Sequence, residues 1–150
     1  MTYKSTKKYG HNLGLSCCFR QWKADSSCKL LHGYALAFKL EFESSNLDHR
    51  NWCVNFGGLK DIKKFLEDKF DHTLLVASDD PKKDIILDLD RIHGIANVIE
   101  IDKTGCEAIA KLVFEFTKTW LEKMNYSHDV KLLSVEVSEH EANSAIYSKE

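Results

Sequence analysis

Alternating apolar and polar positions mark the strongest predicted strand of the chain, over residues 34–43. Its apolar side chains recur at every second position, which is the period of a half-buried strand. They are Tyr34, Leu36, Phe38, Leu40 and Phe42. Shorter runs predict further strands at 13–19, 98–101 and 132–137, with 142–147 as a hairpin partner of the last.

Apolar residues at three- and four-residue spacing predict three helices. The first starts around Gly57, with Asn55 as its cap, and ends at 70–72. The second starts at 79–81 and stops at Gly94. Its buried side is expected to hold Ile85, Ile86 and Leu89.

Thr104 and Glu107 predict a capping box at the start of the third helix, because each side chain could bind a free backbone N–H there. The apolar face of this helix continues from Ile109 to Met124. Taken in order, the strands and helices of residues 1–150 favour one α+β domain with a largely antiparallel sheet.

Composition narrows the classes of function. Of the 150 residues, 43% are hydrophobic, which suffices for one core of ordinary size. The net charge of −2 gives no general attraction to nucleic acid or to an anionic membrane. The amino-terminal residues lack the apolar stretch of a signal peptide, and no run approaches the length of a membrane span. We therefore expect a soluble, cytoplasmic protein whose five cysteines stay thiols.

Candidate chemistry starts at Cys28 and His32, which lie in and just after a predicted turn before the 34–43 strand. A side chain there is held by a rigid sheet yet remains open to a ligand. A thiol and an imidazole can serve as base, nucleophile or metal ligand. A buried core thiol and a hydrogen-bonded histidine are the structural alternatives.

Several motifs, in the same order from about Leu13 to Tyr147, resemble the family of 6-pyruvoyltetrahydropterin synthase and 6-carboxytetrahydropterin synthase. Residues 28–33 resemble its Cys-x-x-x-His-Gly-His motif. The other matching segments are 55–60, like Asp-Phe-x-x-Leu-Lys, 70–72, like Leu-Asp-His, 105–107, where the family has Thr-Ser-Glu, and 135–139, like its closing strand.

The resemblance implies the tunnelling fold, an antiparallel four-stranded sheet with helices on one face that joins its copies into a barrel. Three subunits would close the barrel, two trimers would stack as a hexamer, and active sites would lie between subunits. The implied substrate is a small-molecule pterin, 7,8-dihydroneopterin triphosphate, and the implied cofactor is Zn²⁺ held by three histidines. We expect 6-carboxytetrahydropterin as the product, on the route to 7-deazaguanines such as queuosine.

The resemblance also implies a role for each candidate residue. Cys28 would be the general base, and Asp71 with His72 would complete proton transfer. Glu139 would hold the pterin through two parallel hydrogen bonds, and Glu107 would be a secondary ligand. The structural alternatives are a core thiol, a histidine at a helix end, an exposed glutamate at a strand end and a helix cap.

The implied zinc site departs from the family pattern. Phe19 stands at the first of the three zinc histidines and Tyr34 at the third, which leaves His32 alone. A phenyl ring cannot bind zinc, and a phenol is a poor substitute for an imidazole. A replacement ligand could come from the same strand face as Phe19 or from a loop, at Cys17, His11 or Asp25.

These departures keep alternative functions open. The leading hypothesis is a 6-carboxytetrahydropterin synthase-like lyase, and a 6-pyruvoyltetrahydropterin-type triphosphate elimination could use the same residues. A pterin-binding protein that has lost zinc and turnover is favoured by Phe19 and Tyr34. A structural barrel subunit without any ligand would leave no reason for the candidate residues to occur together.

Overall fold

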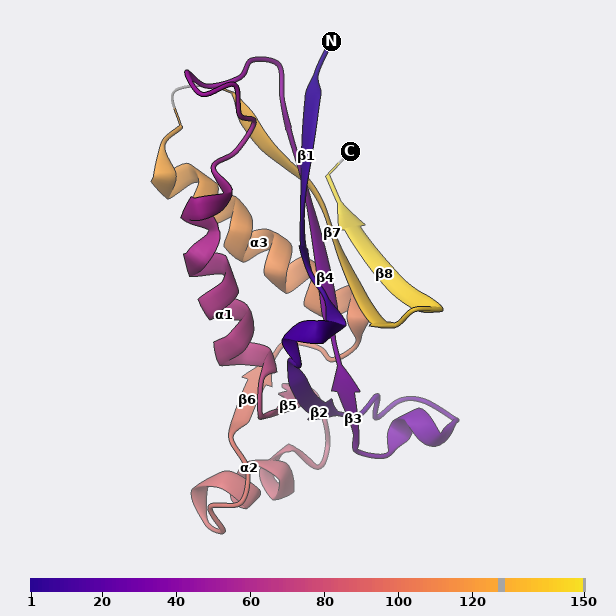
Figure 1. The fold of residues 1–150 in the computed structure, drawn as a ribbon. Coiled ribbons are helices and arrows are strands. Elements are labelled where there is room, and N and C mark those ends of the chain that lie inside the picture. The colour runs from indigo at the N-terminus through magenta and orange to yellow at the C-terminus, as the bar shows by residue number, and fades with distance from the viewer. Residues whose placement is uncertain (127–128, 150) are drawn as a thin grey trace.

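The computed structural model describes residues 1–126 and 129–149, and within them it contains two four-stranded sheets (Figure 1). The strands of the first sheet, in spatial order, are β1 (Tyr3–Tyr9), β4 (Ala37–Ser44), β7 (Val130–His140) and β8 (Asn143–Ser148). Every neighbouring pair in this sheet is antiparallel. The predicted antiparallel four-stranded sheet is therefore confirmed.

The second sheet is smaller and mixed, and it lies in the lower part of Figure 1. Its strands, in spatial order, are β3 (His32–Ala35), β2 (Ser16–Phe19), β5 (Thr73–Ala77) and β6 (Val98–Ile101). The β2–β3 pair is antiparallel, whereas β2–β5 and β5–β6 are parallel. The sheet content of the chain is thus less uniformly antiparallel than the sequence suggests.

Helices α1 (Lys60–Phe70) and α3 (Cys106–Met124) cover one face of the first sheet, and α2 (Lys83–Arg91) packs beside the second (Figure 1). Short 3-10 helices occupy the connections at His11–Leu13, Ser27–Lys29 and Phe56–Leu59. No helix within the described residues is long and apolar enough to cross a membrane.

The main core lies between the first sheet and helices α1 and α3. Strand β4 supplies Phe38, Leu40 and Phe42 to it at every second position, and each is 2% exposed or less. The helical spacing of α1 adds Ile62 and Leu66. The apolar side chains that recur along the strand and along the helix therefore pack together in one layer, and their burial stabilises the contact between sheet and helices.

The predicted 34–43 strand is divided in the structure. Residues 32–35 form β3 in the second sheet, and residues 37–44 form β4 in the first. Leu36 is the residue between them and is fully buried. The prediction of one strand was wrong because the apolar period continues through a residue at which the chain passes from one sheet to the other.

Two predictions about the helices, the α3 capping box and the buried side of α2, also require correction. Helix α3 has Gly105 as its N-cap and no side-chain cap, because the Thr104 hydroxyl donates to the carbonyl of Arg20 at 2.8 Å. Asn55 does cap the helical segment that leads into α1, as predicted, since its side-chain oxygen accepts from the N–H of Gly57; the first turn of that segment is 3-10. In α2, Ile86 is buried as expected, but Ile85 is 61% exposed.

Candidate functional site

Cys28 lies in the 3-10 turn Ser27–Lys29, directly before β3. The Ser26 hydroxyl accepts from the backbone N–H of Cys28 at 3.3 Å, and the N–H of Gln21 donates to the Cys28 carbonyl at 2.8 Å. These bonds fix the backbone while the thiol side remains exposed. The expectation that Cys28 sits in an open turn held against a sheet is confirmed.

Cys28 opens onto a cavity of about 230 Å³, called here the Cys28 cavity. It is lined by Phe19, Gln21, Cys28, Tyr34, Gly105, Cys106, Glu107, Glu139, Asn143 and Ser144. Three residues predicted from the sequence, Cys28, Glu107 and Glu139, thus meet in one place. They come from the loop before β3, the first turn of α3 and the end of β7.

Arg20 ties the Cys28 loop to the rest of the fold. Its guanidinium donates to both carboxylate oxygens of Asp80, at 2.6 and 2.9 Å, and also to the carbonyl of Lys29 at 3.3 Å. The Asp80 side chain is only 2% exposed. The hydrogen bond from Arg20 lowers the pKa of Asp80, so this buried carboxylate stays charged.

Glu139 is held by its own hairpin at the end of β7. Asn143 donates its side-chain amide to a carboxylate oxygen of Glu139 at 3.0 Å, and the nearest ring nitrogen of His140 lies 3.6 Å from the same oxygen. Burial raises the pKa of the neighbouring Cys106 thiol to about 11, with further contributions from the charges of Glu139 and Glu107. Cys106 is therefore a neutral wall of the cavity, and Glu139 is an acceptor within it.

An aromatic stack forms one wall of the Cys28 cavity. The rings of Phe19 and Tyr34 are parallel within 4°, with centroids 4.0 Å apart. The His32 ring lies 4.5 Å from that of Tyr34. Burial, together with nearby charge on Cys28 and Glu139, raises the pKa of Tyr34 to about 12, so its phenol is neutral.

The residues at this wall do not fit a zinc site. Phe19 is 1% exposed and offers no ligand atom. Cys17 is 3% exposed in the core, and burial raises the pKa of its thiol to about 12, which disfavours the thiolate that zinc requires. The Nδ1 atom of His32 lies 2.9 Å from the carbonyl of Leu30, which leaves Nε2 as the one ligand atom that this histidine could offer. Within the described residues, no group of three or more His, Cys, Asp or Glu side chains could hold a metal ion.

Asp71 and His72 form the predicted carboxylate–imidazole pair, with Nδ1 of His72 2.8 Å from Oδ1 of Asp71. Because a carboxylate only accepts, Nδ1 carries the hydrogen and Nε2 is left for other chemistry. The backbone N–H of Ser16 donates to the same carboxylate oxygen at 3.3 Å. His72 adopts a positive φ of 57°, and its side chain is 87% exposed.

This pair does not face the Cys28 cavity of its own chain. His72 lines a different cavity, beside Cys18 and Gly33, which alternate along β2 and β3 with the residues of the aromatic stack. Side chains that alternate along a strand point to opposite faces of a sheet. Within one chain, Cys28 and His72 are therefore on opposite sides of the second sheet.

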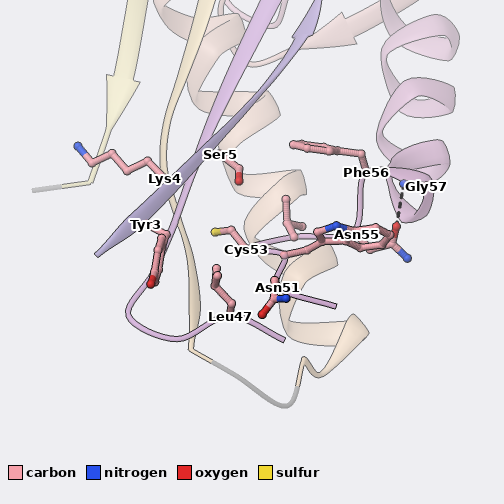
Figure 2. Close-up of a pocket in the computed structure, with 11 residues that line it drawn as sticks. Tyr3, Lys4, Ser5, Leu47, Asn51, Cys53, Asn55, Phe56 and Gly57 are labelled. Carbon is pink, nitrogen blue, oxygen red and sulfur yellow. Dashed lines mark hydrogen bonds between the residues drawn. The ribbon is translucent and has the colours of Figure 1, made fainter. Parts of the chain in front are cut away.

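A larger cavity, of about 420 Å³, lies at the opposite end of the first sheet from the Cys28 cavity, and Figure 2 shows the side chains that line it. Tyr3, Cys53, Asn55 and Phe56 are among the residues around it. It contains none of the residues predicted to carry chemistry, and no acidic or histidine side chain of the described residues lines it. We place the candidate site at the smaller Cys28 cavity because the reactive groups meet there.

Arg20 and Gln21 hold the Cys28 loop, and Asn143 holds Glu139, but none of the three was predicted from the sequence. The Arg20–Asp80 pair joins residues 60 positions apart, so no local pattern could have indicated it. Gly105 is a position that favours glycine. Its φ of 110° disfavours residues with a side chain, and an added Cβ atom would collide with the end of the Gln21 side chain.

A family model described as 6-pyruvoyl tetrahydropterin synthase matches residues 11–150. A 6-carboxy-5,6,7,8-tetrahydropterin synthase of Aquifex aeolicus is 25% identical over 138 residues, covering 91% of this chain and 85% of that protein. The Rickettsia felis protein of the same name is 30% identical over 56 residues, covering 37% of this chain and 41% of its own length.

Solved structures share the fold. An uncharacterized protein from Wolinella succinogenes superposes with a TM-score of 0.83 at 21% identity, covering 100% of this chain and 99% of that one. A 6-pyruvoyl tetrahydropterin synthase from Plasmodium vivax gives a TM-score of 0.72 at 13% identity, with 99% and 98% covered. At these identities the likeness shows a common fold.

Proposed function

The chain belongs to the 6-pyruvoyl tetrahydropterin synthase family, and from this premise we propose that it is a lyase acting on 7,8-dihydroneopterin triphosphate. The proposed product is 6-carboxy-5,6,7,8-tetrahydropterin, a precursor for 7-deazaguanines. The relative from Aquifex aeolicus, which carries this product in its name, supports the choice. The observation that carries the proposal is the meeting of Cys28 and Glu139 in one cavity.

Three residues of the cavity have a task in the proposed reaction. Glu139 accepts two hydrogen bonds from the 2-amino group and the ring N–H of the pterin, as a carboxylate does from a guanidinium. Cys28, in its thiolate form, removes a proton from the side-chain carbon. Glu107 is exposed on the first turn of α3 and would contact the ligand from the other side.

Proton transfer would be completed by the Asp71 and His72 side chains of a neighbouring copy of the chain. Within one chain they lie across the second sheet from Cys28, so the two groups can act on one substrate only if subunits share the site. The volume of the Cys28 cavity supports a site shared between subunits, because about 230 Å³ is below the roughly 300–1,000 Å³ of ordinary small-molecule sites. A second subunit would supply the missing walls.

A catalytically impaired pterin-binding protein is the second candidate, and the stack of Phe19 on Tyr34 favours it. The fold and the Glu139 site would then bind a pterin without turnover. The 6-pyruvoyltetrahydropterin-type elimination is a further variant of the lyase, and it differs in the product rather than in the residues.

Turnover of 7,8-dihydroneopterin triphosphate, followed by mass spectrometry of the product, tests the proposal. We expect slow formation of the 6-carboxy product, abolished in Cys28→Ala. Cys53→Ala is the matched control, because it removes a buried thiol beside the larger cavity at the far end of the first sheet. Pterin binding without any turnover would select the second candidate, and the absence of both would refute the assignment.

A further inference from the structure

The Tyr34 side chain is a polar group of the Cys28 cavity that is held in place by ring packing. Its ring is stacked on that of Phe19, with centroids 4.0 Å apart, and its centroid lies 4.5 Å from that of the His32 ring, two residues earlier on the same strand. Phe19 is itself 1% exposed in the core, so the stack rests on a fixed base. A hydroxyl at the end of a ring held in this way has little freedom and is suited to selective binding.

The cavity presents both acceptors and donors to a ligand. Glu107 and Glu139 are carboxylates, which only accept hydrogen bonds, and the side-chain oxygen of Gln21 accepts from Thr104. Within the described part of the chain, no hydrogen bond to the Tyr34 hydroxyl is found. This hydroxyl is therefore a donor that the cavity wall can offer to a ligand oxygen.

We propose that the Tyr34 hydroxyl binds a side-chain hydroxyl oxygen of a reduced pterin whose ring is held by Glu139. The inference rests on the proposed function and adds a specificity-determining residue to it. It follows from a disagreement between sequence and structure, because the wall where the family resemblance implies a metal is filled by an aromatic stack. A neutral hydrogen-bond donor stands there instead.

The bond would act during proton removal as well as in binding. When Cys28 takes the proton, the C–H bond breaks, an S–H bond forms and the electron pair passes into the conjugated pterin ring. Tyr34 keeps its own proton throughout and donates a hydrogen bond to the oxygen on the reacting carbon. A fixed donor of this kind holds the side chain in the geometry in which that C–H bond faces the thiolate.

Two pterins that differ at the side chain test the inference without requiring turnover. Calorimetry would compare 7,8-dihydroneopterin, which carries side-chain hydroxyls, with 6-methyl-7,8-dihydropterin, which carries none. We expect the native protein to prefer the hydroxylated ligand by roughly tenfold. Tyr34→Phe keeps the ring stack and should lose this preference while binding the methyl compound equally well.

Tyr3→Phe is the matched control, because it removes the same hydroxyl from an exposed tyrosine at the far end of the first sheet. It should leave the preference unchanged. Undiminished preference in Tyr34→Phe would overturn the inference while leaving the proposed function intact. Failure of the native protein to bind either pterin would overturn both.

Discussion

Glu139 is the residue at which recognition of the pterin ring can be tested most directly. Changing Glu139 to Gln replaces one acceptor with a donor and opposes it to a donor of the ligand. We expect pterin binding to weaken by about 2 kcal/mol or more, since a charged acceptor is lost and a buried donor is left unpaired. Calorimetry with 7,8-dihydroneopterin measures the change.

Glu136→Gln is the control for this prediction. Glu136 lies on the same strand and accepts from the Ser144 hydroxyl at 2.8 Å, but it does not line the Cys28 cavity. Both variants should unfold at the same denaturant concentration as the native chain. Equal pterin affinity in all three proteins would remove Glu139 from the site.

Metal content is the second property decided by single residues. With Phe19 and Tyr34 stacked beside His32, the purified protein should hold well under one zinc ion per chain after dialysis, as measured by elemental analysis. The double variant Phe19→His, Tyr34→His adds two imidazoles beside the one already present and should retain more zinc. Stoichiometric, tightly held zinc in the native protein would contradict the prediction.

Among the elements, the connection from β2 to the Cys28 loop depends on the Arg20–Asp80 pair. Asp80 precedes α2, and its carboxylate also accepts from the backbone N–H of Lys82 at 2.8 Å. Because Arg20 reaches the carbonyl of Lys29 as well, one guanidinium joins β2, the approach to α2 and the loop that carries Cys28. A change at Asp80 should therefore disturb both stability and the site.

The Arg20–Asp80 pair should make the stability of the fold fall at acidic pH. The folded-state pKa of Asp80 lies below its unfolded value, so as the pH falls the unfolded chain binds the proton first. The stabilisation is present above about pH 4 and is lost as the pH falls through the folded-state pKa. Asp80→Asn should cost about 2 kcal/mol at neutral pH and show a shallower loss of stability toward pH 3.

Urea unfolding at several pH values measures this effect. Asp68→Asn is the control, because the Lys64–Asp68 pair is exposed on α1 and such surface pairs contribute little. It should follow the native chain at every pH. A native-like pH profile in Asp80→Asn would show that the Arg20–Asp80 pair does not stabilise the fold.

Most of the helices and strands could be predicted from the sequence, but some strands could not. Helices α1 and α3 and the β7–β8 hairpin were predicted, because a period is visible wherever one side of an element is buried. Strand β5 was missed, since all five of its residues are buried and no alternation remains. Strand β1 was missed as well, because its exposed edge position leaves it largely polar.

The candidate site also has features that the sequence predicts and features that it does not. Cys28, Glu107 and Glu139 were predicted and do meet in one cavity. The capping box failed because the partner of the Thr104 hydroxyl lies 84 residues away. The separation of His72 from Cys28 depends on which face of a sheet each loop reaches, and that requires the register of the second sheet.

At the scale of the whole molecule, the first sheet has two open edges, β1 and β8. Adjacent strands alternate in direction through four strands, so these edges run antiparallel to each other. A ring of copies joined through β8 and β1 would be antiparallel throughout and would leave no edge unpaired. We expect light scattering to report a trimer or hexamer, and a monomer at micromolar concentration would contradict the proposed barrel.

Sharing of active sites between subunits can be tested by mixing two inactive variants. Cys28→Ala lacks the base and His72→Ala lacks the imidazole, so each oligomer alone should be inactive. When equal amounts are unfolded and refolded together, about a quarter of the sites in a symmetric ring should pair a native Cys28 with a native His72 from its neighbour. Turnover should recover to roughly that fraction of the native rate.

The control mixture combines Cys28→Ala with the double variant Cys28→Ala, His72→Ala, which can never form a complete site and should stay inactive. Native mass spectrometry confirms that mixed oligomers have formed. If they form without recovery of turnover, Asp71 and His72 do not act on a substrate held at the Cys28 cavity of a neighbour. Because the second sheet separates the two groups within one chain, the pair would then have no route to the reaction.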